Sequence, residues 1–266
     1  MSVMRLNQSA PRAVIEGLVL AIALTGLSYI VGALFGWLPN GVNWWEFGAV
    51  FTSYWCTYLC VMQRRINYPL GAISSALYCV LFVQQDLVAS ALLNGYLVIA
   101  LVYGWLRWRK DSNARPVTRV SLKATPLYIL TTAVFYGGAV WLVTAFGGSF
   151  APLDTVILIG TILAQFLMDN KKIENWVIWA IVDVVAIYVY FSSGLPIATF
   201  QYVFFLANTV WGFFEWKRSY DAKRVIQYGQ IVEGPTKGVF ILPDDELPPM
   251  VHDEDWNFPN VPEKNS

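Results

Sequence analysis

Charged side chains are scarce in this chain. They make up 14% of its 266 residues, whereas hydrophobic residues make up 56%. Soluble domains average about 25% charged and about 45–50% apolar residues. So few charges cannot cover the surface of a water-soluble fold that contains this much apolar material. The composition therefore excludes an ordinary soluble domain and predicts a chain that is largely embedded in lipid.

The sequence also has little of what metal and catalytic sites need. His252 is the only histidine, and the three cysteines, Cys56, Cys60 and Cys79, all lie in apolar runs. Cys56 and Cys60 are one helical turn apart, but a zinc site needs further ligands, so we interpret them as soft packing residues. The sequence contains no phosphate-binding loop, zinc signature or catalytic-triad spacing. We therefore expect neither an enzyme nor a metal or cofactor site, and no nucleic-acid partner.

Long apolar runs are what the sequence does contain. A helix needs about 20 mostly apolar residues to cross a bilayer, and we find eight such runs. They cover residues 13–37, 43–62, 67–84, 87–108, 123–146, 152–168, 174–192 and 195–216. This pattern predicts an all-α membrane protein with eight transmembrane helices.

The positions of the cations predict how these spans are oriented. Lys and Arg near the ends of spans favour the cytoplasmic side. If the N-terminus is cytoplasmic, all 18 Lys and Arg residues fall at the inner ends of the spans, in the inner loops or in the C-terminal tail, and none falls in the four outer loops. We therefore expect eight spans with both termini in the cytoplasm.

Two segments share a set of features that favours an internal duplication. Asn67–Lys110 and Asn175–Arg218 align without a gap at an offset of 108 residues, and each begins with Asn shortly after a basic pair. Each also ends with Gly-x-x-x-Trp and two basic residues. Similar hairpins can arise by chance, but the agreement at both ends favours a real repeat. Adding the preceding span to each gives two parallel three-helix repeats, at 43–110 and 152–218.

The rest of the chain divides around these repeats. Residues 1–40 hold an additional first helix, and residues 111–150 hold a linker with one connecting helix, which parallel repeats of three helices require. The predicted architecture is thus 3+1+3 helices after an N-terminal helix, a plan in which transporters bind cargo near the midplane between repeats. Residues 219–266 form an acidic, proline-rich tail, which we expect to be mostly disordered, with a small hairpin at Gln230–Pro243.

One carboxylate lies in the middle of an apolar run. Asp183 is at the centre of residues 174–192, where a charge costs about 2.5–3.5 kcal/mol on insertion scales. Trp176 and Trp179 precede it by seven and four residues, so all three share one helix face. A carboxylate beside aromatic rings suits a flat organic molecule that is cationic or hydroxylated. Alternatively, the tryptophans anchor the helix at the membrane interface and Asp183 makes a packing contact.

Side-chain amides also lie inside the apolar runs and are candidates for the same pocket. They are Asn94, Gln165, Gln201 and Asn208, of which the last two share a helix face. The alternative is that they form hydrogen bonds between helices, which are worth about 0.6 kcal/mol on average. Ser75 occupies the position equivalent to Asp183 in the first repeat, so the two halves of the pocket should differ.

The stretches Gln165–Asp183 and Leu92–Trp108 resemble the PnuC family of nicotinamide riboside transporters. The most specific element is the pattern Trp-x-x-Trp-x-x-x-Asp/Asn, which Trp176, Trp179 and Asp183 match. The resemblance covers about residues 43–218. Asn94 departs from the family, in which Gln is expected at this position.

This resemblance implies a SWEET-like 3+1+3 fold in the inner membrane and a homo-oligomer, of which a trimer is one form. It also implies uptake of nicotinamide riboside by facilitated diffusion, followed by trapping through cytoplasmic phosphorylation. Two alternatives stay open: a transporter of the same fold for thiamine or another vitamin, and a membrane scaffold or receptor whose tail binds a partner.

Overall fold

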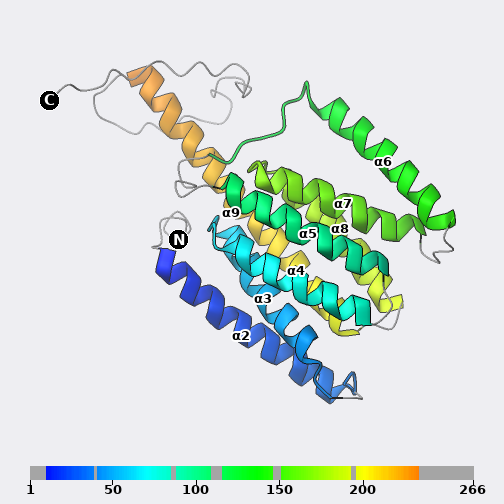
Figure 1. Ribbon diagram of the computed structural model, residues 1–266. Helices are drawn as coiled ribbons and strands as arrows, with labels where there is room; N and C mark the ends of the chain where they lie inside the picture. Colours follow the sequence, from blue (N-terminus) through cyan, green and yellow to red (C-terminus); the bar gives the residue numbers. More distant parts are fainter. Residues whose placement is uncertain are drawn as a thin grey trace.

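The part of the chain that the structure describes folds into eight helices (Figure 1). A computed structural model describes residues 10–38, 41–84, 88–108, 116–145, 151–192 and 196–233. The helices are α2 (Ala10–Leu34), α3 (Trp44–Val61), α4 (Asn67–Gln84), α5 (Val88–Arg107), α6 (Thr125–Ala145), α7 (Ala151–Asp169), α8 (Asn175–Ser192) and α9 (Pro196–Glu233). Within these ranges there is no strand, only an isolated bridge between Thr118 and Lys172. The predicted all-helical fold is therefore confirmed.

Among the described residues, four helices are each long and apolar enough to cross a membrane. The qualifying segments are Pro11–Leu34, Ser90–Arg107, Asn175–Ser192 and Pro196–Ala222, which belong to α2, α5, α8 and α9. Large apolar side chains on their outer surfaces, such as Leu92 and Ile99, are exposed. Such surfaces are stable in lipid but not in water. The chain is thus a multi-pass membrane protein.

The last helix corrects one expectation from the sequence. Helix α9 continues to Glu233, whereas we expected a disordered tail from residue 219. The first residues beyond the apolar run are held by ion pairs along the helix, Lys217–Asp221 at 3.8 Å and Arg218–Glu215 at 3.0 Å, and such pairs stabilise a helix. The proposed hairpin loses its first four residues to this helix, and the rest of it lies outside the described residues.

Six of the eight described helices form two groups of three. Neighbours pack within α3–α4–α5 and within α7–α8–α9, and the groups meet where α3 contacts α9 and α5 contacts α7. Helix α2 covers α3 and α9. Within the described part of the chain, α6 contacts no helix except α7, and it stands apart from the bundle in Figure 1. The two groups therefore enclose the centre of the molecule, and α2 and α6 lie outside it.

The turns that follow α3 and α7 have the same backbone geometry. Gln63 and Lys171, which are 108 residues apart, have φ values of 54° and 50° and are the positive-φ residues other than glycine in the described ranges. In each turn an asparagine side chain, Asn67 or Asn175, donates a 2.6 Å hydrogen bond to the carbonyl three residues before it. These bonds begin α4 and α8 in the same way.

Buried tryptophans join the two groups at the end of the bundle where these turns lie. Trp108 and Trp216 are fully buried, with ring centroids 6.3 Å apart. The Trp108 indole N–H donates to the Asp169 carbonyl, and the Trp216 indole N–H donates to the Cys60 carbonyl. Each tryptophan thus bonds to the helix group opposite its own.

Glycine allows close packing within each group. A Cβ added at Gly104 of α5 would overlap the Tyr68 ring of α4, and one at Gly212 of α9 would overlap the Trp176 ring of α8. The predicted Gly-x-x-x-Trp motif therefore places an aromatic ring of the neighbouring helix against each glycine.

Replacing Gly104 with alanine should lower the melting temperature of the detergent-solubilised protein. The added Cβ would collide with Tyr68 and lie 2.6 Å from Asp169 Oδ1, and overpacking of this kind costs about 1–3 kcal/mol. Gly95, also on α5, has no atom within 4 Å of an added Cβ, so G95A should keep or slightly raise the melting temperature. Equal melting temperatures for the two variants would contradict this packing.

Candidate functional site

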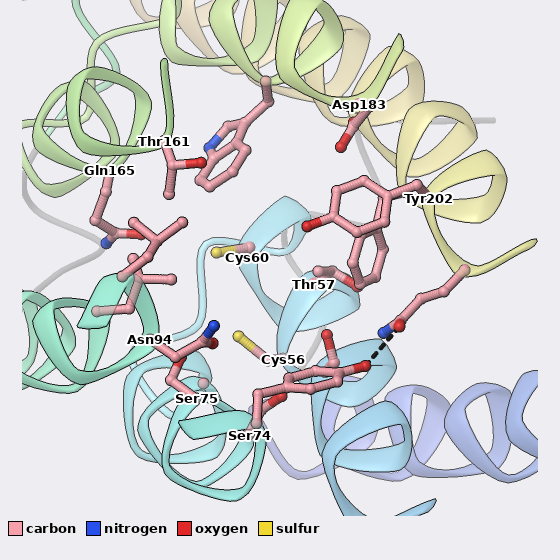
Figure 2. Close-up of a pocket in the computed structure, with 18 of the residues that line it drawn as sticks. Cys56, Thr57, Cys60, Ser74, Ser75, Asn94, Thr161, Gln165, Asp183 and Tyr202 are labelled. Atoms are coloured by element: carbon pink, nitrogen blue, oxygen red, sulfur yellow. Dashed lines mark hydrogen bonds between the residues drawn. The ribbon is translucent and has the colours of Figure 1, made fainter. Parts of the chain in front are cut away.

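A cavity of about 230 Å³ lies between the two groups of helices. One water molecule occupies about 30 Å³ of liquid, so the cavity has room for an organic molecule rather than a single ion. All seven residues that the sequence singled out line it: Asn94, Gln165, Trp176, Trp179, Asp183, Gln201 and Asn208. Figure 2 shows that side chains from both groups point into this space.

Asp183 is the one charged residue among the described residues that line the cavity. Its side chain is only 2% exposed and accepts a 2.8 Å hydrogen bond at Oδ2 from the Thr209 hydroxyl of α9. Position 183 therefore faces the interior of the bundle and not the lipid chains. Thr209 thus holds the carboxyl group in place, and no Lys or Arg is among the described lining residues.

The two tryptophans of α8 also face inward. Trp176 is 3% exposed and packs edge-on against Trp216, with centroids 5.4 Å apart. A membrane-interface anchor would be exposed, so this alternative is wrong for Trp176. The indole nitrogens of both Trp176 and Trp179 are buried, and neither has a hydrogen-bond partner among the described residues. Both side chains line the cavity, but their N–H groups are enclosed by the protein, so the rings rather than the nitrogens meet a bound molecule.

The four amides differ in how the protein holds them. Gln165 Nε2 donates to Asp169 Oδ1 at 2.8 Å, and Gln201 Oε1 accepts from the Tyr78 hydroxyl at 2.6 Å. Asn208 Nδ2 lies 3.4 Å from the Thr57 carbonyl of α3, a long hydrogen bond between helix groups. Asn94 Nδ2 donates to the Ser90 carbonyl of its own helix at 2.9 Å.

Several cavity residues and their partners were not predicted from the sequence. Tyr78 and Thr209 line the cavity, but nothing in their apolar runs distinguishes them from packing residues. Asp169 holds Gln165 without being conspicuous, because it comes just before the basic pair and resembles the solvated end of a helix. Ser75, the counterpart of Asp183, also lines the cavity, as its place in the repeat suggested.

The cysteines lie closer to the cavity than we expected. Cys56 and Cys60 both line it, and Cys60 Sγ is 3.1 Å from Met168 Sδ of the other helix group. All three cysteines of the chain are free thiols. In the part of the chain that the structure describes, no cluster of three His, Cys, Asp or Glu residues could hold a metal ion.

A bundle of apolar helices around a buried cavity with polar side chains defines the class of solute transporters. The model of the family described as "Nicotinamide mononucleotide transporter" matches residues 43–218, and the chain belongs to this family. The resemblance found in the sequence is therefore confirmed, as is the expectation that the chain is a transporter and not an enzyme.

Similar proteins include several with curated names. The nicotinamide riboside transporter PnuC of Escherichia coli strain K12 is 24% identical over 191 residues, which cover 61% of this chain and 80% of the relative. The protein of the same name from Neisseria mucosa is 25% identical over 195 residues, which cover 67% and 74%. The riboflavin/roseoflavin transporter RibM of Streptomyces davaonensis is 27% identical over 137 residues, which cover 49% and 64%.

A solved structure has the same fold. The crystal structure of the vitamin B3 transporter PnuC superposes with a TM-score of 0.63 at 22% identity and covers 77% of this chain and 91% of its own.

Cys56 should react with a small charged methanethiosulfonate reagent faster than Cys79. Cys56 is half-buried and lines the cavity, whereas Cys79 lines an outer groove of α4 and α5 with apolar residues such as Val83. The thiolate attacks the sulfenyl sulfur of the reagent and displaces a sulfinate, and water stabilises the thiolate whereas lipid does not. Mass spectrometry should show that C56S lacks the fast-reacting thiol and that C79S retains it. Faster labelling of Cys79 would mean that water does not reach this cavity.

Proposed function

We propose that this protein carries nicotinamide riboside across the membrane. The observation that supports this most directly is the composition of the cavity: one buried carboxylate, Asp183, close to two indole side chains, with no Lys or Arg among the described lining residues. The nicotinamide ring of the riboside is flat and carries a positive charge. An aromatic face attracts such a cation, and a carboxylate in a low-dielectric site attracts it further.

The same observation argues against the phosphorylated form, nicotinamide mononucleotide, as cargo, although the description of the family names this mononucleotide. A phosphate group is normally held by Arg or Lys, and none lines the described cavity. A phosphate dianion beside the buried Asp183 carboxylate would be repelled. The riboside has hydroxyl groups in place of this charge, and these suit the surrounding amides. Two relatives named as nicotinamide riboside transporters agree with this choice.

The cavity residues have separate roles in this proposal. Trp179, with Trp176 next to it, stacks on the base, and Asp183 complements the ring charge or holds the ribose. Gln165, Gln201 and Asn208 provide polar contacts. Asn94 has the weakest role, because its amide nitrogen is already bonded within its own helix.

We further propose that the core is a 3+1+3 arrangement in which the two repeats rock around the central cavity to alternate access. Several pairs of equivalent residues support the duplication, each separated by 108 positions. Gln63 and Lys171 adopt the same positive φ, and Gly104 and Gly212 each accommodate an aromatic ring. In this plan 43–110 and 152–218 are the repeats, 111–150 the connector, 1–40 an added region and 219–266 a tail.

The proposed setting is the inner membrane, with both termini in the cytoplasm. The distribution of Lys and Arg supports this orientation. We also propose that the protein forms a homo-oligomer, of which a trimer is one form. The exposed apolar side chains of α6, including Phe135 and Trp141, offer a surface that either lipid or another copy can cover.

Purified protein in liposomes should equilibrate labelled nicotinamide riboside without concentrating it. The described cavity contains one ionisable acid and no chain of such groups across the membrane, so facilitated diffusion is expected. Uptake at a plateau equal to the external concentration, with or without a pH gradient, is the predicted result. Accumulation that depends on a proton gradient would contradict uniport.

Replacing Asp183 with asparagine should weaken competition by cationic ligands selectively. We expect the inhibition constant of the riboside to rise about tenfold or more, because a charge contact in a buried site is lost. Riboflavin, which is neutral, should be affected much less, and nicotinamide mononucleotide should compete poorly in the parent protein. The matched control is T209V, which removes a hydrogen bond to Asp183 but keeps its charge.

The competition series also separates the remaining alternatives. Thiamine displacing the riboside at lower concentration would identify thiamine as the cargo, and riboflavin doing so would place this chain with RibM. A scaffold or receptor that binds its partner through the tail would lose its function when the tail is deleted. A chain that ends at Glu233 should therefore keep full transport if the proposed function is right.

A further inference from the structure

The acid Asp169 lies just beyond the cavity and holds one of its amides. Asp169 and Gln165 are one turn apart on α7, and both are buried. Gln165 Nε2 donates a 2.8 Å hydrogen bond to Asp169 Oδ1. The hydroxyl of Tyr68, on α4 of the other group, donates to the same oxygen at 2.9 Å. The space for this second bond exists because position 104 is glycine.

This arrangement fixes which end of the Gln165 amide faces the cavity. Asp169 Oδ1 accepts from both Tyr68 and Gln165, and only the nitrogen of an amide can donate to an accepting oxygen. The carbonyl oxygen then points the other way, and Gln165 lines the cavity. An amide free to rotate could offer either a donor or an acceptor, but Gln165 offers an acceptor.

The protein holds Gln201 by the other end of its amide, the oxygen. Its Oε1 accepts from the Tyr78 hydroxyl, and its Nε2 is buried without a hydrogen-bond partner in the described part of the chain. The two glutamines line one cavity from different helices, α7 and α9. The cavity thus meets an acceptor at position 165, whereas the nitrogen of Gln201 is enclosed by the protein.

We propose that Asp169 is a positioning residue that makes position 165 selective for a hydrogen-bond donor on the cargo. The inference rests on the proposed function, which supplies the cargo, and adds which of its groups faces Gln165: a hydroxyl or the N–H of a carboxamide. A site built to bond a substrate N–H or O–H strongly rejects an analogue that lacks it, because the buried protein group is left unpaired.

Transport of methylated ribosides tests this selectivity. The analogues carry one blocked donor each: an N,N-dimethyl carboxamide, or a methyl ether at a single ribose hydroxyl. In the parent protein, blocking the donor that faces Gln165 should lower kcat/KM about tenfold. Q165L should transport the same analogue as well as it transports the unmodified riboside. This result would identify the blocked group as the partner of Gln165.

The role of Asp169 is then read from the same ratio of kcat/KM values. In D169N the new amide can donate as well as accept, so Gln165 can reverse and offer its nitrogen to the ether oxygen. The tenfold preference should fall to about twofold. The matched control is Y68F, which removes the hydrogen bond from Tyr68 to Asp169 and should keep the preference. Melting temperatures of all variants report whether they are folded.

The outcomes distinguish this inference from the proposed function. A preference that survives in D169N, or that is lost equally in Y68F, would overturn the positioning role. If the parent protein transports no riboside, the proposed function fails instead. The same ratios, measured with riboflavin and its methyl ethers, then decide the role of Asp169 by the same two outcomes.

Discussion

The structure depends on one constraint: a polar group without a hydrogen-bond partner is costly inside a membrane, so the protein supplies partners for the carboxyl group and the amides around the cavity. Asp183 is bonded by Thr209, Gln201 by Tyr78 and Gln165 by Asp169. All three side chains also line the cavity. The hydrogen bonds that make these groups tolerable within the bundle therefore also decide what they can offer to a cargo.

The same constraint explains how much could be predicted from the sequence. Eight helices were predictable because apolar runs of this length have few other uses. Asp183 and the amides were identifiable because polar groups are rare and costly in such runs. Their partners were not identifiable, because Thr209 and Tyr78 are unremarkable in sequence and come from helices whose pairing no local pattern reveals. Asp169 was not identifiable because it lies at the end of its apolar run, shortly before two lysines, where a solvated acid is expected.

The end of α9 shows the opposite limit. Its apolar segment ends at Ala222, and composition alone suggested a disordered tail from residue 219. Helix formation there relies on neighbouring charges along the helix and on continuation of a helix already begun, which avoids the cost of nucleation. Hydrophobicity predicts where the membrane ends but does not predict where a helix ends.

The difference between Ser75 and Asp183 has a consequence for how cargo is held. The two residues occupy equivalent positions in helices α4 and α8, yet one is neutral and the other acidic, and both line the cavity. A charge on Asp183 therefore makes the electric field inside the pocket directional, because the neutral Ser75 does not balance it. A cation with one charged end has a single preferred orientation in such a field, and it keeps that orientation whichever side of the membrane it came from.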